Sequence, residues 1–370
     1  MKKTTQQKID ERKKTFLTRA YSAIFVAGFY VLYCLLLVFS NEHWFTPLMD
    51  LSETKRHAVQ FSLNFINILT LVPVIYFVAN ELTNLCFPGR KRVFIYTVCS
   101  LFTITVGLGI LLLGMRYKFF NINSSAYSEL QLFLILSLSV IAFFTLMSTL
   151  VWGSLSRRIV YVGRKTRFWY PFLVFILNTF FVGFMYTTII HTWTTYAFLL
   201  LTSVLCDVFA YLGGSQFGKH KMAPLISPKK TWEGVIFGAA ITLLIVCGVF
   251  GLFHIKGAEE MDYSLYKYLG CQTCNPGNNL KPYFWGIYVG VTLILMFVSV
   301  SGDLFFSWIK RRFNIKDFSN LIPGHGGMLD RLDAFIFVFN FYFLTTVIIQ
   351  LISKSHGGLE VLWGNNNFVF

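Results

Sequence analysis

Eight stretches of this chain contain no Asp, Glu, Lys or Arg, and nearly all of them are long enough to cross a bilayer as a helix. They are 20–40, 58–80, 93–115, 130–152, 168–206, 235–253, 282–302 and 334–353. A helix needs about 20 apolar residues to span the hydrocarbon core. The 168–206 stretch is long enough for two spans, with a polar turn at His191–Thr194 between them. The sequence therefore predicts an all-α polytopic membrane bundle of about nine transmembrane helices.

The basic residues between these stretches indicate which side of the membrane each loop faces. If the N-terminus lies inside, the inner segments carry 24 of the 32 Lys and Arg residues and the outer segments carry 8. Cytoplasmic loops are enriched in Lys and Arg, so this distribution predicts the N-terminus inside and the C-terminus outside. It also accounts for most of the net charge of +15. No soluble basic domain remains that would predict a nucleic-acid partner.

The predicted spans divide the chain into four parts. These are a cytoplasmic N-terminal segment (1–19), the N-terminal transmembrane helices (20–190), a catalytic transmembrane region (191–353) and an external C-terminal tail (354–370). The third part contains two cytoplasmic loops, 207–234 and 303–333, and each begins with an aspartate at the end of an apolar stretch. Ionisable residues at the edge of a span are costly and are functional candidates by default.

The 303–333 loop begins with a polar helical face if the preceding span continues as a helix. Asp303, Ser307, Lys310 and Arg311 then lie at positions i, i+4, i+7 and i+8, which share one face of a helix. One carboxylate, one hydroxyl and two cations would point the same way. We therefore treat these four residues as candidate site residues.

A glycine-rich turn, Pro323-Gly324-His325-Gly326-Gly327, follows and cannot be helical. Glycines ahead of a helix N-terminus predict a phosphate-type anion site, because the first N–H groups of the helix are free. Asp330 and Asp333 lie at i and i+3 in the next helical turn, and two carboxylates beside a phosphate cradle suit a hard divalent cation such as Mg²⁺. The alternative is structural, since acidic residues are favoured in any first helical turn and Arg331 would then neutralise Asp330.

The 207–234 loop indicates phosphate binding of a second kind. It starts at Asp207 and contains the run Ser227-Pro228-Lys229-Lys230-Thr231 just before the next span. Adjacent lysines beside Ser and Thr hydroxyls suit a triphosphate, on which lysine acts as a point charge. The alternative is a juxtamembrane lysine pair seated at lipid headgroups. Because successive spans flank the two loops, we expect the loops to meet at one site on the inner face.

Both loops match one known family. Residues 307–333 read Ser-x-x-Lys-Arg-x-x-x-x-Lys-Asp-x-Ser-x-x-Ile-Pro-x-His-Gly-Gly-x-x-Asp-Arg-x-Asp. This resembles the signature of the phosphatidate cytidylyltransferase (CDP-diacylglycerol synthase) family at every defined position. The run Ser-Pro-Lys-Lys-Thr-Trp-Glu-Gly at 227–234 resembles the second hallmark of that family. The resemblance covers about residues 200–335, whereas the N-terminal half is similar only in being polytopic and apolar.

The resemblance implies that the protein transfers the cytidylyl group of CTP to phosphatidate and releases pyrophosphate, with Mg²⁺ as cofactor and a second cation beside it. It implies that Asp303 and Asp330 are metal ligands, with Asp333 and Asp207 near the second cation. The catalytic set would be Asp303, Asp330, Asp333, Lys310 and Arg311. The substrate-binding set would be Ser227, Lys229, Lys230, Thr231, Ser307, Lys316, His325, Gly326, Gly327 and Arg331, with the adjacent lysines on the CTP phosphates.

The resemblance also implies CTP, phosphatidate and bilayer lipid as partners, and a homodimer, which is common in the family. We expect a bacterial plasma membrane as the location, with the endoplasmic reticulum as the alternative. A CTP-dependent polyprenol or phytol kinase is the alternative enzyme, and it would need a base to deprotonate its alcohol substrate. A transporter that uses the inner polar loops as a gate is the non-enzymatic alternative. Transporters usually show repeated halves, and no repeat is visible here.

Overall fold

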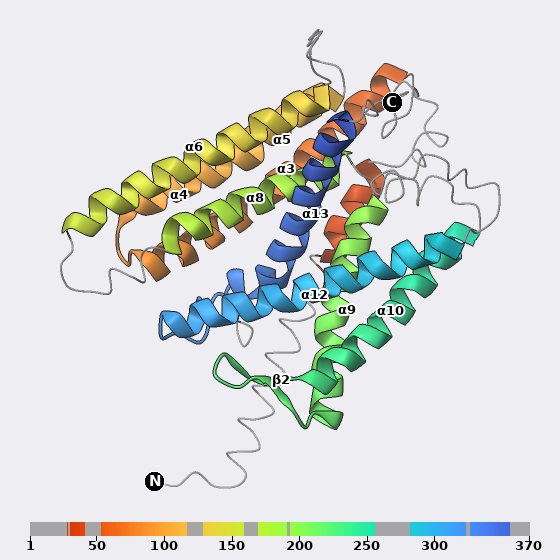
Figure 1. The fold of residues 1–370 in the computed structure, drawn as a ribbon. Helices are drawn as coiled ribbons and strands as arrows, with labels where there is room; N and C mark the ends of the chain where they lie inside the picture. Colours follow the sequence, from red (N-terminus) through yellow and green to blue (C-terminus); the bar gives the residue numbers. More distant parts are fainter. Residues whose placement is uncertain are drawn as a thin grey trace, which may run out of the picture.

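The computed structural model describes residues 28, 30–40, 53–116, 129–158, 169–190, 193–255, 282–322 and 326–355. Within these ranges the chain is helical apart from its turns and one two-stranded antiparallel sheet (Figure 1). The predicted segment 1–19 and nearly all of the predicted tail 354–370 lie outside the described residues.

The helices are long and follow one another with short connections in most of the described chain. They are α3 (Glu53–Cys86), α4 (Lys91–Phe102), a π-helical turn η1 (Thr103–Gly107), α5 (Leu108–Arg116), α6 (Glu129–Arg158), α8 (Trp169–Ile190), α9 (Trp193–Phe217), α10 (Trp232–Ile255), α12 (Pro282–Arg312) and α13 (Leu329–Ser355). The strands β1 (Lys221–Ala223) and β2 (Ser227–Thr231) form a hairpin between α9 and α10. A further apolar helix covers Tyr30–Ser40.

Seven of the described helical segments are long and apolar enough to cross a membrane. Two shorter apolar helices, Tyr30–Ser40 and Leu136–Val151, accompany them. These helices confirm the predicted polytopic helix bundle. The division of the 168–206 stretch is also confirmed, because α8 ends at Ile190 and α9 begins at Trp193.

The helices form two groups joined by α13. In Figure 1, α3 to α8 lie together on one side, α9 and α10 lie on the other, and α12 crosses α13. A Cβ placed on Gly183 of α8 would lie 2.8 Å from the Phe343 side chain, so α13 packs closely against the first group. A Cβ placed on Gly302 of α12 would lie 2.8 Å from the Phe337 side chain, so the crossing with α12 is equally tight.

The beginning of the expected 207–234 loop is helical rather than extended. Residues 207–217 continue α9, and three glycines let α9 approach α10. A Cβ on Gly234 would lie 2.6 Å from the carbonyl oxygen of Ala210, and a Cβ on Gly213 would lie 2.5 Å from the Phe237 ring. Small residues at helix contacts allow such close packing in membrane bundles. Consequently Gly213 and Gly214 serve helix packing.

Candidate active site

The polar face predicted for α12 is present, because the helix continues to Arg312 without a break. Ser307 Oγ donates a hydrogen bond to Asp303 Oδ1 over 3.4 Å, as the i, i+4 spacing requires. Arg311 Nε donates to the carbonyl of Ile226 over 3.2 Å, and its Nη1 donates to the carbonyl of Ile315. Arg311 therefore ties the β-hairpin to the inner end of α12.

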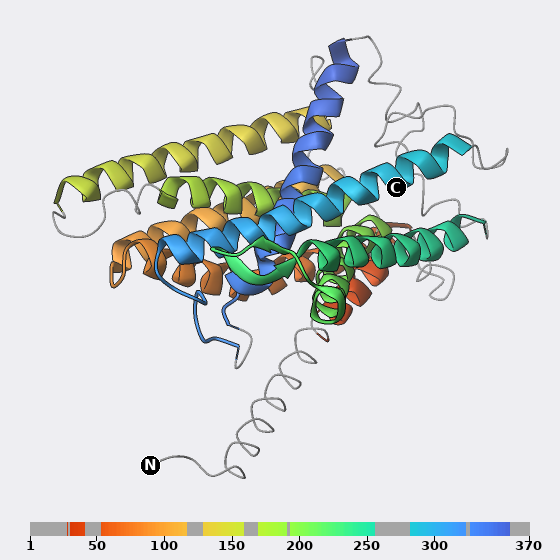
Figure 2. The ribbon, with the colours of Figure 1, turned by 60° about the horizontal axis from the view of Figure 1, so that its bottom comes forward.

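The β1–β2 hairpin places Lys230 beside Asp303. Lys230 Nζ forms an ion pair with Asp303 Oδ2 at 2.5 Å, and the two side chains are 19% and 24% exposed. Figure 2 shows the hairpin lying along α12 beside the start of α10. Successive side chains of a strand point to opposite faces, so the neighbouring Lys229 is exposed. The two adjacent lysines thus have different surroundings, although the two predicted loops do meet.

Three carboxylates surround the Lys230 ammonium. Asp303 of α12, Asp207 of α9 and Asp333 of α13 all interact with it electrostatically. Burial alone lowers the pKa of Lys230, but the charges of Asp303 and Asp207 outweigh burial, so its pKa lies above the ordinary 10.5. The ammonium is therefore charged near neutral pH. The electrostatic partners of Lys230 therefore come from three helices, α9, α12 and α13.

Asp330, at the start of α13, holds the turn that precedes it. Lys310 Nζ donates to Asp330 Oδ1 over 2.7 Å, and the N–H groups of Phe318 and Gly327 each donate to Asp330 Oδ2 over 2.8 Å. The Asp330 side chain is only 3% exposed. Gly326 has φ +84°, and a Cβ there would lie 2.8 Å from Asp330 Oδ2. Glycine is therefore required at position 326, both for its backbone conformation and for space.

Glu81 of α3 enters the same turn from the N-terminal half of the chain. Its carboxylate accepts hydrogen bonds from Ser319 Oγ over 2.6 Å and from the N–H groups of Met328 and Leu329 over 2.8 Å each. Glu81 is 3% exposed. Our sequence reasoning did not select it. Its one sequence signal is its position directly after the apolar stretch 58–80, where an ionisable residue is costly.

Comparison with known proteins shows the family of this chain. The model of the family described as "Cytidylyltransferase family" matches residues 13–349, which is most of the chain. The chain belongs to the cytidylyltransferase family. The match includes the N-terminal half, where the sequence offered no motif.

Two relatives of this chain are bacterial enzymes. The phosphatidate cytidylyltransferase of Rickettsia typhi is 39% identical over 141 residues, which are 38% of this chain and 51% of that protein. The phosphatidate cytidylyltransferase of Staphylococcus aureus is 39% identical over 143 residues, which are 39% of this chain and 44% of that protein. The chain thus spans about half the length of the relatives it matches.

The residues predicted to bind substrate lie in different surroundings. Thr231 is buried, and its Oγ1 accepts a hydrogen bond from Gly234 N over 3.3 Å at the start of α10. Lys316 is exposed. Arg331 interacts electrostatically with Asp207, and its Nε is buried without a hydrogen-bond partner in the described part of the chain. His325 lies outside the described residues. Their roles in binding stay predictions.

The N–H groups predicted to cradle an anion already have partners in this structure. Gly327 N donates to Asp330, and Met328 N and Leu329 N donate to Glu81. Two carboxylates of the chain itself therefore accept the N–H groups at the start of α13. Lys230 and Lys310 remain as positive charges close to the α12 face for an incoming phosphate.

The family resemblance implies a bound Mg²⁺, and the carboxylates of the site can be compared with the ligands that this ion prefers. Asp207, Asp303 and Asp333 offer carboxylate oxygens, the ligands that Mg²⁺ prefers, and all three interact electrostatically with Lys230. In the described ranges, no three His, Cys, Asp or Glu groups lie close enough to hold a metal ion as they stand. The three aspartates fit the ion by the chemistry of their oxygens. Asp330 fits less well, because its side chain is only 3% exposed and its oxygens accept three hydrogen bonds from the protein.

Proposed function

We propose that this chain transfers the cytidylyl group of CTP to phosphatidate, giving CDP-diacylglycerol and pyrophosphate. The observation that carries the proposal is the ion pair between Lys230 and Asp303, which unites the two motifs in one place. The activity is that of the named bacterial relatives, and their family includes this chain. A membrane bundle suits a reaction between a soluble nucleotide and a lipid.

The reaction depends more on stabilising negative charge than on transferring a proton. An oxygen of the phosphatidate phosphate attacks the α-phosphorus of CTP, and the bond from that phosphorus to the β-phosphate oxygen breaks as pyrophosphate leaves. The nucleophile is already an anion, so no strong general base is required. Two anions must be brought together and the leaving charge stabilised. Lys310, Arg311 and Arg312 in the last turn of α12 supply positive charge about two helical turns beyond Asp303.

Mg²⁺ is part of this proposal. Asp303, Asp207 and Asp333 would hold it, and a second cation would be held by the same group of carboxylates. When bound, the ion neutralises charge on the phosphates and the leaving pyrophosphate. Lys230, which pairs with Asp303 in this structure, would then be available to the triphosphate, with Lys229 as an outer contact.

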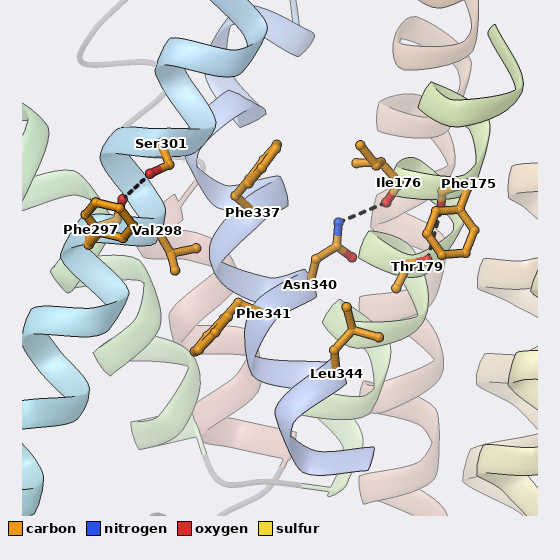
Figure 3. Close-up of a pocket in the computed structure, with 10 residues that line it drawn as sticks. All are labelled: Phe175, Ile176, Thr179, Phe297, Val298, Ser301, Phe337, Asn340, Phe341 and Leu344. Atoms are coloured by element: carbon orange, nitrogen blue, oxygen red, sulfur yellow. Dashed lines mark hydrogen bonds between the residues drawn. The ribbon is translucent and has the colours of Figure 1, made fainter. Parts of the chain in front are cut away.

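An apolar groove offers a place for a lipid chain. A cavity of about 300 Å³ lies between α8, α12 and α13, and Figure 3 shows side chains of all three helices around it. Phe297 and Ser301 of α12 line one side, and Phe341 and Leu344 lie on α13. Ser301 is two residues from Asp303 on α12, about 3 Å along the helix axis. Residues two apart do not share a face of a helix, so an acyl chain of phosphatidate in this groove would place its headgroup at the membrane depth of Asp303 but on a different side of α12.

The topology completes the proposal. The seven long apolar helices and the two shorter ones support nine spans. With the N-terminus inside, both motifs face the cytoplasm, where CTP is found. The bacterial relatives favour a bacterial plasma membrane. A homodimer remains a proposal based on the family alone.

Product analysis tests the function. The purified protein in detergent would receive phosphatidate, Mg²⁺ and CTP labelled on the α-phosphate. Label entering a lipid, with pyrophosphate released, is the expected result. Label that stays in soluble CDP and appears only when a lipid alcohol is supplied would indicate a polyprenol or phytol kinase instead. Absence of turnover with any lipid, in folded protein, would contradict both enzymes and favour the transporter.

A further inference from the structure

We propose that Glu81 of α3 is a positioning residue for the reaction centre, because it fixes the turn that carries Asp330 and the start of α13. The inference rests on the proposed function for its kinetic part only. In the contacts described above, Glu81 touches none of the three aspartates proposed to hold the metal. Its effect would pass through the turn between Ser319 and Leu329.

The contacts of Glu81 are those of a helix cap supplied from another helix. The first N–H groups of a helix have no partner within it, and a carboxylate near a helix N-terminus is stabilised by the helix dipole. Glu81 accepts two such N–H groups, from Met328 and Leu329. The third contact, from Ser319 Oγ, holds the opposite end of the same loop. One buried carboxylate therefore closes the loop across its base.

Asp330 and Glu81 accept hydrogen bonds from different N–H groups of the turn. Asp330 accepts Phe318 N and Gly327 N, while Glu81 accepts the next two N–H groups along the chain. Lys310 from α12 pairs with Asp330, so this network joins α3, α12 and α13. Loss of Glu81 would leave the N–H groups of Met328 and Leu329 without their acceptor, and an unpaired donor away from water is destabilising.

The close packing of Gly327 against Glu81 supports the inference independently of the hydrogen bonds. A Cβ on Gly327 would lie 2.5 Å from Glu81 Oε1 and 2.7 Å from Glu81 Oε2. Distances this short are not tolerated between a carbon and an oxygen atom. A side chain at position 327 would therefore displace the Glu81 carboxylate from the position in which it accepts the Met328 and Leu329 N–H groups. The glycine turn in the C-terminal half therefore contacts a residue that lies 246 positions earlier in the chain.

The test compares Glu81→Ala and Glu81→Gln with Asn80→Ala. Asn80 is the neighbour on α3, is exposed and bonds only to Asn84 in the described contacts, so it controls for a change in the same turn of helix. Hydrogen exchange reports whether the Met328 and Leu329 amides are held. Steady-state kinetics with CTP and phosphatidate report whether the centre is positioned.

We expect Glu81→Ala to speed exchange at the two amides and to lower kcat by about 10²-fold, since a small misplacement of reacting groups has effects of that size. The KM for CTP should stay within about threefold, because no nucleotide contact is removed. Glu81→Gln retains an acceptor and should recover part of kcat. Unchanged exchange, or a kcat equal to that of Asn80→Ala, would overturn the inference.

A suppressor pair covers the case in which Glu81→Ala does not fold. Gly327→Ala should lose activity because its methyl group meets Glu81, and Glu81→Asp in the same chain should restore activity by withdrawing the carboxylate by one methylene. Failure of that rescue would overturn the inference. If the unmodified protein transfers no cytidylyl group, the proposed function fails, whereas the exchange result still decides whether Glu81 holds the turn.

Discussion

The two groups of helices bury polar atoms in different ways. In the N-terminal group the buried contacts are between neutral side chains, such as Ser100 with Asn178 at 3.3 Å and Thr97 with Tyr170 at 2.9 Å. The C-terminal group has a buried neutral pair as well, Ser203 with Ser299 at 2.9 Å, but it adds pairs that carry charge. Lys230 pairs with Asp303, and Lys310 pairs with Asp330.

This difference separates packing from chemistry. Neutral pairs between membrane helices contribute about 0.6–2 kcal/mol and need no desolvation of an ion. Charged groups at membrane depth are costly and are retained where they have a function. Glu81 is the exception, because it is a charge of the N-terminal group that serves the C-terminal one. The N-terminal helices therefore act as more than a membrane anchor.

The largest effect should come from the centre of the charged group. Asp303→Asn keeps the size and polarity of the side chain but removes the charge that faces Lys230. We expect turnover to fall by at least about 10²-fold, with folding intact by thermal unfolding. The measurement is lipid-incorporated label from CTP, with Asp262→Asn, outside both motifs, as the control. Full activity in Asp303→Asn would remove this residue from the centre.

The adjacent lysines provide a second comparison, because β2 directs them to opposite faces. Lys230→Ala leaves its aspartates without their cation and should lower kcat and destabilise the protein by about 2 kcal/mol. Lys229→Ala should raise the KM for CTP about tenfold, the loss expected for one charge-assisted contact, with little change in stability. Equal effects in the two variants would contradict the geometry of the strand. An unchanged KM in Lys229→Ala would refute its contact with the triphosphate.

Much of this arrangement could be predicted from the sequence. Charge-free stretches indicate helices directly, and the i, i+4 spacing of Asp303 and Ser307 requires only that α12 continue. The meeting of the two motifs followed from their position next to successive spans. Pairings between distant segments could not be predicted. Glu81 and Leu329 are 248 residues apart, and apolar periodicity shows which residues form a helix but not which helix packs beside it.

Local context explains the remaining differences. The glycines at 213 and 214 look like loop residues, yet they lie inside α9 because α10 approaches there. The glycine turn before α13 looks like an open anion cradle, yet two carboxylates occupy its N–H groups. In both cases glycine is selected by a close neighbour, and the sequence alone does not reveal that neighbour.

A smaller and selective effect should follow from filling the apolar groove. Leu344→Trp adds a ring to the cavity on α13 and should raise the KM for long-chain phosphatidate several-fold, since each buried methylene is worth about 0.8 kcal/mol. The KM for CTP and the KM for short-chain phosphatidate should not change. Ile348→Trp, on an exposed position of the same helix, is the control. A chain-length-independent effect would argue against an acyl chain in the groove.

The smallest effect on activity should come from the neutral pair of the N-terminal group. Asn178→Ala removes the acceptor and donor of Ser100 at a site far in sequence from both motifs. We expect a loss of about 1 kcal/mol in the free energy of unfolding, measured by thermal or denaturant unfolding in detergent, and a kcat equal to that of the unmodified protein. A large fall in kcat would mean that the N-terminal helices influence the centre through packing as well as through Glu81, because the Asn178 side chain forms no described contact with the charged groups of α12 and α13.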